Sequence, residues 1–375
     1  TQDDYWTQVS TSMIDKVIDT TTKENNRYQI LEELGRGSYG CLFLGQSLLD
    51  NAYVAIKVLC KTGLDHQQLE LQQLEIDIQQ TLKHTHLLTL HGTVQDKDYI
   101  YMVMELCDQG DLFDFVVRSK NNRQEDLVVH TFSQILEAVD YMHSRSVYHR
   151  DIKLENILLK TSDLDESLVE CKVADFGLAT RERFNMEFGC GSTSYLAPEH
   201  FDDEENNDAM DLTIINNGGN NHYDCEEQLL AYDAAASDIW SLGILLLALL
   251  FGRNPWEEAT TMDVAYREFK RDPTVLKHQL FPTLSTGCYR LLKSVLSPNP
   301  ANRPSITEMK HQFQALDRLL VDEHCEEDTA ATSIQDNDDD YYCWPVSFDS
   351  AIFSGTYRAG SGESWSDMVE EEQDE

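Results

Sequence analysis

The chain has 375 residues, 41% of them hydrophobic, which is enough for a sizeable core divided over two or three structural units. Its 29 basic and 67 acidic side chains leave a net charge of −38. This charge argues against nucleic acid as a partner, because phosphates require a basic face, and against docking on an anionic membrane.

Most of the negative charge lies in two segments. Residues 202–230 carry nine acidic side chains and no Lys or Arg, and residues 321–375 carry 17 acidic side chains and one Arg. Together they hold 25 of the 38 excess charges, and neither shows sustained apolar periodicity. We therefore expect an acidic insertion over 202–230 that is a loop or disordered, an acidic, aromatic-containing tail over 321–375 that is disordered or docks, and an N-terminal extension over 1–27.

A glycine-rich turn between two predicted strands comes early in the chain. Ile30–Leu34 leads into Gly35-Arg-Gly37-Ser-Tyr-Gly40, and Cys41–Leu44 follows. Such glycines let bare backbone approach phosphate groups, although a plain hairpin can have the same letters. A strand after the turn, instead of a helix, disfavours a dinucleotide-binding fold.

The next predicted strand, Val54–Val58, contains a lysine between apolar neighbours. Lys57 would be costly to bury unless it is paired, and the simpler interpretation is an edge-strand lysine that faces solvent. A helix is predicted over 69–82 from four apolar residues at helical spacing: Leu71, Leu74, Ile78 and Leu82. Glu75 lies one position off this stripe and could meet Lys57, with Glu70 as the rival, and either could be a solvated helix charge.

Four side chains suited to phosphoryl transfer follow in the middle of the chain. Asp151 could accept the proton of a hydroxyl group, and Lys153 could neutralise a γ-phosphate. Asn156 and the later Asp175 could ligate one divalent cation. Phosphoryl transfer needs little beyond positioned charge, so these groups suffice for it.

The longest apolar run, Ile239–Phe251, has 13 residues, which is too short to cross a bilayer, so we expect a buried core helix and no membrane partner. The nine cysteines are scattered, odd in number and contain no Cys-x-x-Cys pair. They fit reduced thiols in the cytoplasm, the nucleus or both.

In order and spacing these motifs resemble a eukaryotic protein kinase over about residues 28–315. The matching motifs are the glycine-rich turn, Val54-Ala-Ile-Lys57, a Glu in the predicted helix (Glu75, with Glu70 as the rival), His149-Arg-Asp151 with Lys153 and Asn156, Asp175-Phe-Gly177, and Ala197-Pro-Glu199. Lys153 and Gly191-Ser192 are typical of Ser/Thr kinases. Phe188-Gly-Cys-Gly-Ser-Thr193 and Gly252-Arg-Asn-Pro-Trp256 look like fungal Ser/Thr kinases that restrain meiosis or respond to glucose and nutrients.

The resemblance implies an α+β, bilobal fold and an ATP-dependent Ser/Thr protein kinase that uses Mg²⁺. A small β-rich N-lobe would span about 28–104, and a larger, mainly helical C-lobe about 108–315, with the insertion at about 202–230. The ATP contacts implied are Leu34, Gly35, Gly37, Gly40, Leu42, Ala55, Lys57, Met104, Glu105, Cys107, Asp111 and Leu158.

The resemblance also assigns catalytic roles. Lys57 would pair with Glu75, Asp151 would be the base with Lys153 beside it, and Asn156 and Asp175 would be the magnesium ligands. Two structural contacts are implied as well: Glu199 with Arg303, and Asp238 with the backbone of the catalytic loop.

Two positions depart from the family pattern. Phe188 stands where an activating phosphothreonine is often found, and Glu187 beside it could take the place of the phosphate opposite Arg150. Gln79, one turn after Glu75, stands where most kinases have an apolar residue, and this bears on the active position of the helix.

Asp111 and Glu155 match positions that meet arginines upstream of the target hydroxyl in basophilic kinases, so protein substrates with upstream Arg are expected. Asp111 could instead bind the ATP ribose, or could do both. The acidic tail could dock on the kinase domain, recruit a regulatory partner or have no role.

The alternative functions are a pseudokinase scaffold and a small-molecule kinase. The full catalytic set disfavours the first, and Ser192–Glu199, which resembles a peptide-docking platform, disfavours the second.

Overall fold

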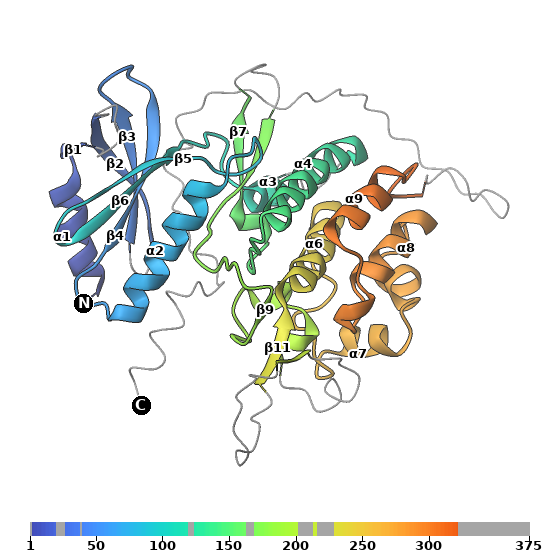
Figure 1. Cartoon of the computed structure of the whole chain (residues 1–375). Helices are drawn as coiled ribbons and strands as arrows, with labels where there is room; N and C mark the ends of the chain where they lie inside the picture. Colours follow the sequence, from blue (N-terminus) through green and yellow to red (C-terminus); the bar gives the residue numbers. More distant parts are fainter. Residues whose placement is uncertain are drawn as a thin grey trace, which may run out of the picture.

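The computed structural model describes these residues: 2–19, 27–37, 40–118, 124–162, 169–201, 213–215 and 229–321. They form two lobes that lie side by side in Figure 1, a β-rich N-lobe drawn in blue and a larger helical C-lobe drawn from green to orange. The expected α+β, bilobal architecture is therefore present.

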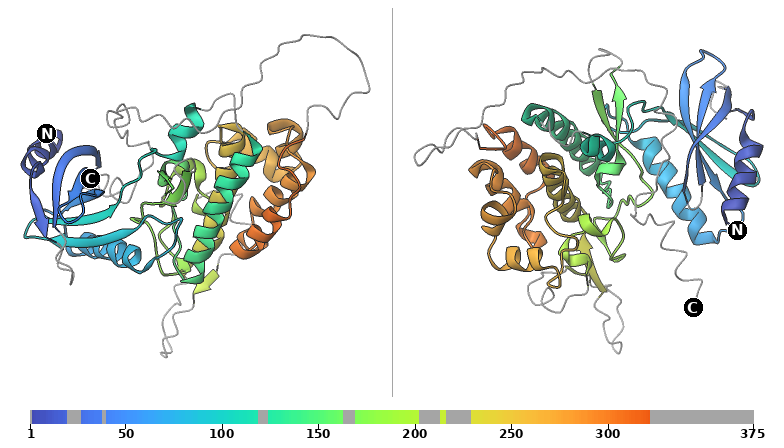
Figure 2. Two further views of the ribbon diagram at one scale, coloured as in Figure 1. Left: turned by 90° about the horizontal axis from the view of Figure 1, so that it is seen from above. Right: turned by 180° about the vertical axis from the view of Figure 1, so that it is seen from behind.

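The N-lobe is a six-stranded sheet in the order β1-β2-β3-β4-β6-β5. Its strands are β1 (Val17–Asp19), β2 (Arg27–Gly37), β3 (Gly40–Ser47), β4 (Tyr53–Cys60), β5 (Leu90–Gln95) and β6 (Tyr99–Glu105). Helices α1 (Gln2–Met13) and α2 (His66–Thr81) cover opposite faces of this sheet, as Figure 2 shows from above and from behind. Each face consequently has its own apolar cluster.

Residues before the predicted domain boundary belong to the same folded unit as the sheet. Strand β1 pairs with β2 through Val17↔Gln29 to Asp19↔Arg27, and α1 buries Val9 and Met13 against the strands. The expected extension over 1–27 thus contributes one strand and one covering helix to the N-lobe. Its apolar positions are too few for a clear periodic signal, which is why the sequence did not reveal it.

Helix α2 begins earlier than predicted, at His66, because Asp65 forms a capping box with Gln68. The predicted apolar stripe was only partly right, since Ile78 and Leu82 are buried but Leu71 and Leu74 are half-buried. The buried face is largely polar: Gln68, Gln72, Glu75 and Gln79. The helix therefore has hydrogen-bonding groups on its inner face, where Gln72 donates to the Cys60 carbonyl oxygen of β4 at 3.1 Å.

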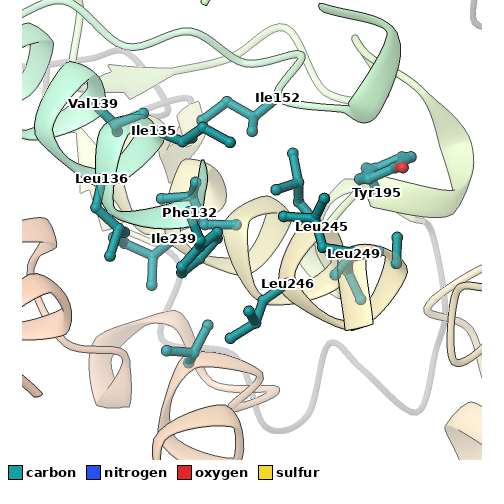
Figure 3. Close-up of a cluster of buried hydrophobic side chains, with 14 of the residues drawn as sticks. Phe132, Ile135, Leu136, Val139, Ile152, Tyr195, Ile239, Leu245, Leu246 and Leu249 are labelled. Carbon is teal, nitrogen blue, oxygen red and sulfur yellow. The ribbon is translucent and has the colours of Figure 1, made fainter. Parts of the chain in front are cut away.

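The C-lobe is built around two packed helices, α4 (Glu125–Ser144) and α6 (Ala234–Phe251). Figure 3 shows Phe132 and Ile135 of α4 meeting Ile239 and Leu245 of α6 in the main core. Around this pair lie α3 (Leu112–Arg118), α7 (Val264–Arg271), η4 (Leu276–Leu280), α8 (Thr286–Val295) and α9 (Ile306–Gln314). In the described part of the chain, α6 is the one helix long and apolar enough to cross a membrane, and 83% of it is buried in the protein, as expected for a core helix.

Short elements between these helices carry the polar residues at the lobe interface. A hairpin of β7 (Ile157–Thr161) and β8 (Val169–Val173) follows the 3-10 turn η1 (Leu154–Asn156). The turns η2 (Thr193–Tyr195), η3 (Pro198–His200) and η5 (Pro300–Asn302) complete the lobe.

Part of the acidic insertion forms strands where a loop was expected. Strand β10 (Thr213–Ile215) pairs with β11 (Leu229–Asp233), which in turn pairs with β9 (Phe184–Asn185). The rest of the insertion, 202–212 and 216–228, lies outside the described residues, as does the tail from residue 322 onward.

Candidate active site

Both lobes contribute to an apolar surface beneath the sheet. Met104 is buried there, and Leu42, Cys107 and Leu158 pack against the same cluster. Ala55 is the strand partner of Met104. Five of the predicted ATP contacts therefore come together from β3, β4, β6, the connection after β6, and β7, and they form an apolar site suited to a purine.

The charged side chain of Glu105, after Met104, does not belong to this surface. Its Oε1 accepts a hydrogen bond from the Thr89 amide at 2.7 Å, and its Oε2 lies 3.4 Å from Lys172 and 3.6 Å from Lys160. The carboxylate is thus used to fasten β6 to the C-lobe hairpin. Only the backbone of Glu105 is left for a contact with the adenine.

The glycine-rich turn closes the site on the N-lobe side. Gly35 pairs with Leu42, and Gly37 pairs with Gly40 where β2 passes into β3, while the tip at residues 38–39 lies outside the described residues. Leu34 precedes them in β2 and is half-buried. A Cβ at Gly40 would lie 2.5 Å from the Val58 carbonyl oxygen, so this position requires glycine for strand packing as well as for phosphate approach.

Lys57 points into the cleft and pairs with α2. Its Nζ lies 2.7 Å from Glu75 Oε1, and the side chain of Glu75 is only 3% exposed. The rival Glu70 is exposed and lies 3.4 Å from His66. The structure therefore places Glu75, and not Glu70, against the lysine.

Gln79 is accommodated without displacing α2. Its buried amide donates to the Leu88 carbonyl oxygen at 3.2 Å and approaches Met104 Sδ at 3.6 Å. A buried amide is costly only when its hydrogen bonds are missing. The departure from the family pattern is thus compatible with the formed Lys57–Glu75 pair.

The Asp151 carboxylate is surrounded by four donors. Oδ1 accepts from the Ser192 amide at 3.0 Å and the Ser192 hydroxyl at 2.8 Å. Oδ2 accepts from Asn156 Nδ2 at 2.9 Å and lies 2.9 Å from Lys153 Nζ. Lys153 also donates to Ser192 Oγ at 2.7 Å. The carboxylate is therefore buried and fixed in one orientation.

Sequence reasoning did not select Ser192 as a site residue. The residue that could have pointed to Ser192 is the preceding Gly191. Its φ is 119°, and a Cβ added there would lie 2.7 Å from the Arg150 carbonyl oxygen. Only glycine fits there, and this close approach brings Ser192 to Asp151. His149 was also not selected, although its Nδ1 accepts from the Asp151 amide at 3.3 Å and its Nε2 contacts the Ala174 carbonyl at 3.0 Å.

The catalytic loop has a strained backbone that α6 holds in place. Arg150 has a φ of 69°, which is unfavourable for a residue with a Cβ. The amides of His149 and Arg150 donate to the buried Asp238 carboxylate at 2.9 and 2.8 Å, and His143 Nε2 contacts it at 2.8 Å. Asp238 thus anchors the loop as expected.

Asn156 and Asp175 can supply oxygen ligands for a metal ion. The Ala174 amide donates to the Asn156 carbonyl at 2.8 Å, so the two elements are adjacent. Asn156 uses its Nδ2 hydrogens on Asp151, which turns its Oδ1 away from that carboxylate. Asp175 is exposed and has a φ of 61°. Such a pair suits Mg²⁺, which takes few protein ligands and completes its shell with phosphate and water oxygens.

The charge state of Asp175 fits the same role. Surrounding protein atoms raise its pKa, but interactions with Lys57, His149, the Gly177 amide and Lys153 outweigh that effect and hold the pKa below its ordinary value. The carboxylate is therefore ionised at neutral pH.

Two acidic residues, Asp111 and Glu155, lie next to β7. Asp111 forms a β-bridge with Leu158 and accepts the Asp114 amide at 2.8 Å. Burial, together with the carboxylates of Asp114 and Glu155, raises the pKa of Asp111 to about 6. Oε2 of Glu155 is buried and has no hydrogen-bond partner among the described residues. Both residues predicted to meet substrate arginine thus share one negatively charged region.

The segment after Asp175 is held by side-chain contacts. Arg150 Nη1 lies 2.8 Å from Glu187 Oε2, and the arginine side chain is only 4% exposed while that of Glu187 is 58% exposed. Phe188 packs against Tyr232 with ring centres 5.2 Å apart. An ion pair joins Arg183 of this segment to Asp233 of β11 at 2.9 Å.

A buried ion pair fixes the end of this segment to the C-lobe. Arg303 donates to both oxygens of Glu199 at 2.7 Å, and both side chains are fully buried. The guanidinium also lies 5.0 Å from the ring centre of Trp240. The predicted Glu199–Arg303 contact is thus present, with a structural role.

Comparisons with known proteins agree with this arrangement. The family model described as protein kinase domain matches residues 28–213 and 219–313. The "Negative regulator of sexual conjugation and meiosis" of Schizosaccharomyces pombe is 33% identical over 280 residues, covering 74% of this chain and 57% of that protein. The "Serine/threonine-protein kinase ksp1" of the same yeast is 31% identical over 308 residues, covering 79% and 58%.

A plant protein shows a similar relationship. The "CBL-interacting protein kinase 9" of Oryza sativa subsp. japonica is 32% identical over 294 residues, covering 77% of this chain and 56% of the plant protein. The chain thus spans somewhat more than half the length of the curated relatives it matches. With a family match over most of its length and the assembled site described above, the chain belongs to the protein kinase family.

Proposed function

We propose that this protein transfers the γ-phosphate of MgATP to serine or threonine hydroxyl groups of protein substrates. The observation that carries this proposal is the Asp151 carboxylate, which Lys153, Asn156 and Ser192 hold in one buried network. The name of the yeast relative, serine/threonine-protein kinase ksp1, supports the Ser/Thr class.

The side chains of the chain divide the work of phosphoryl transfer. Lys57, held by Glu75, binds the α- and β-phosphates, and the glycine-rich turn offers backbone amides to the phosphates. Asp151 accepts the proton of the substrate hydroxyl, and Lys153 balances charge on the transferred group. Asn156 and Asp175 would hold Mg²⁺, which neutralises phosphate charge when bound.

The alternative is a pseudokinase that keeps the fold as a scaffold. Such proteins lose at least one catalytic group or its geometry. In this chain Lys57, Asp151, Asn156 and Asp175 are all present, and the first two are engaged in short contacts with their expected partners. This observation favours an active enzyme.

For substrates, we propose a preference for arginine upstream of the target residue. Glu155 is half-buried, and its carboxylate is the kind of group with which a guanidinium pairs. Asp111 lies near enough for its pKa to respond to Glu155, so the two carboxylates act on one region.

The cellular setting is inferred from the relatives and from the thiols. One relative is named a negative regulator of sexual conjugation and meiosis, which supports a role in nutrient or cell-cycle and meiosis signalling. Six cysteines among the described residues are free thiols, which supports a cytoplasmic or nuclear location. A regulatory partner, or the domain itself, is proposed for the acidic tail.

A positional peptide library tests the activity and the preference together. With MgATP we expect phosphoserine and phosphothreonine, no phosphotyrosine, and enrichment of upstream arginine. Glu155→Gln should lower kcat/KM for arginine peptides about tenfold, because a hydrogen bond to a charged group is lost. Peptides without arginine serve as the control and should change little. Equal use of both peptide sets by the wild type would refute the arginine preference alone.

A further inference from the structure

Helix α1 lies outside the residues matched by the family model, yet it contacts the strand that carries the glycine-rich turn. Val9 and Met13 bury one side of the helix in the apolar cluster it shares with β2, β3 and β4. Thr7 and Ser10 are three residues apart and therefore neighbours on the helix surface. Figures 1 and 2 show this helix on the face of the sheet opposite α2.

These two hydroxyls take part in a network with β2. Arg36, within the glycine-rich motif, donates from Nη1 to Thr7 Oγ1 at 2.9 Å. Its Nη2 donates to Glu33 Oε2 at 3.0 Å, and its Nε also contacts that carboxylate. Ser10 Oγ donates to the same Glu33 oxygen. Helix and strand are thus joined by two hydroxyls, one carboxylate and one guanidinium.

A β-bulge makes this network possible. The pairing of β2 with β3 slips by one residue between Glu33 and Gly35, so the usual alternation of faces is interrupted. Glu33 and Arg36 consequently meet on the α1 side, with side chains 22% and 35% exposed. Burial raises the pKa of Glu33, but the bonds from Arg36 and Ser10 more than offset this, so the carboxylate stays ionised.

We propose that α1 positions the glycine-rich turn for the phosphates of ATP, with Thr7 and Ser10 as positioning residues. The inference rests on the proposed function. Arg36 lies between Gly35 and Gly37, so holding its side chain restrains the backbone where the turn begins. A glycine-rich segment loses much conformational freedom on binding, and a segment that is already held loses less. Removal of the two hydroxyls lowers ATP affinity although neither touches ATP.

Calorimetric binding of ATP and of adenosine to the full chain tests this proposal. We expect the double variant Thr7→Val, Ser10→Ala to bind ATP about fivefold more weakly, roughly the effect of one net hydrogen bond. Adenosine has no phosphates, so its affinity should be unchanged. Thr7→Ser keeps the hydroxyl and should bind ATP like the wild type.

Thr11→Val is the matched control, because Thr11 Oγ1 donates to the Thr7 carbonyl oxygen within the helix and not to the sheet. Equal ATP affinity in the wild type and the double variant would overturn the proposal. A parallel loss of ATP and adenosine affinity would also overturn it, since this would indicate general damage to the N-lobe. A wild-type chain that binds no ATP would contradict the proposed function itself.

Discussion

Asp111 shows how a single residue can be assigned to one of two roles. It lies where either an ATP ribose or a substrate arginine could reach it, beside the carboxylates of Asp114 and Glu155. Its pKa is raised to about 6 by burial and by these two neighbours, so the side chain changes charge within a range that enzyme assays can cover. A neutral carboxyl group still accepts a hydrogen bond from a ribose hydroxyl, but it no longer attracts a guanidinium.

This difference predicts how the KM values for an arginine peptide and for ATP should change with pH. Because the pKa is raised, Asp111 is charged above about pH 6 and neutral well below it. If it binds arginine, KM for an arginine peptide should rise about two- to fivefold from pH 7 to pH 5, the worth of a partly exposed ion pair. KM for ATP should change less. Initial rates across this range provide the measurement.

Asp111→Asn is the control for this experiment, because it mimics the neutral form at every pH. It should raise the KM for the arginine peptide at pH 7 and remove the extra rise at pH 5. If KM for ATP changes instead, and the variant affects ATP alone, Asp111 binds the ribose and not the substrate arginine.

At the residue scale, the sequence predicted side chains whose chemistry demands one residue type. Lys57, Asp151, Asn156 and Asp175 could be predicted as site residues because phosphoryl transfer requires a cation, a base and metal ligands at fixed places. Ser192 was not found, because its role comes from a chain reversal at Gly191 that only the three-dimensional structure shows. The sequence also did not show that Glu105 uses its carboxylate to contact Lys160 and Lys172, which leaves only its backbone for a contact with the adenine.

At the scale of elements, the segment from Asp175 to Glu199 is held by ion pairs and strand pairing. Glu187 occupies the place opposite Arg150, whose buried guanidinium would otherwise lack this anionic partner. Strand β9 of the segment pairs with β11 at the end of the acidic insertion, and Arg183 pairs with Asp233. The insertion therefore contributes to the shape of this segment.

We expect Glu187→Gln to lower kcat/KM for a peptide about five- to tenfold, because Arg150 loses its charged partner while it stays buried. Glu182→Gln is the matched control, since Glu182 is an exposed acid in the same segment. Phosphatase treatment of the wild type should leave its activity intact. Loss of activity after phosphatase, with the removed phosphate mapped by mass spectrometry near Phe188, would contradict this account.

Elements were predictable where their periodicity was strong. The apolar run of α6 predicted a core helix, and the sequence also predicted the strands on both sides of the glycine-rich turn. Helix α2 was predicted, but its buried face was assigned from apolar residues alone. Glu75 and Gln79 are also buried, because they make hydrogen bonds there. Among the described side chains of helix α1, residues 7–13, the buried apolar ones are Val9 and Met13, and no sequence pattern showed that the helix covers the sheet.

At the scale of the whole molecule, the two lobes have different tasks. The N-lobe contributes Lys57, Glu75 and the glycine-rich turn, and the C-lobe contributes the network around Asp151. Asp238 and the Glu199–Arg303 pair connect that network to α6 and the lobe core. The negative charge that dominates the composition lies mainly in the insertion and the tail, so it says little about the catalytic body.

The order of the motifs allowed the bilobal fold to be predicted, because each motif has a fixed place in it. The position of residues 2–19 on the N-lobe could not be predicted in this way, since it depends on packing against strands that are distant in sequence. The pairing of β11, at the end of the insertion, with β9 could not be predicted for the same reason.

The central claim is that Asp175, with Asn156, supports phosphate transfer by the Asp151 network. The most direct measurement compares transfer of γ-phosphate from MgATP to a Ser/Thr peptide by the wild type and by Asp175→Ala, prepared identically and matched in thermal unfolding. We predict transfer by the wild type and a loss of at least about 100-fold in the variant. Equal transfer by the two proteins, or none by the wild type, would contradict the account.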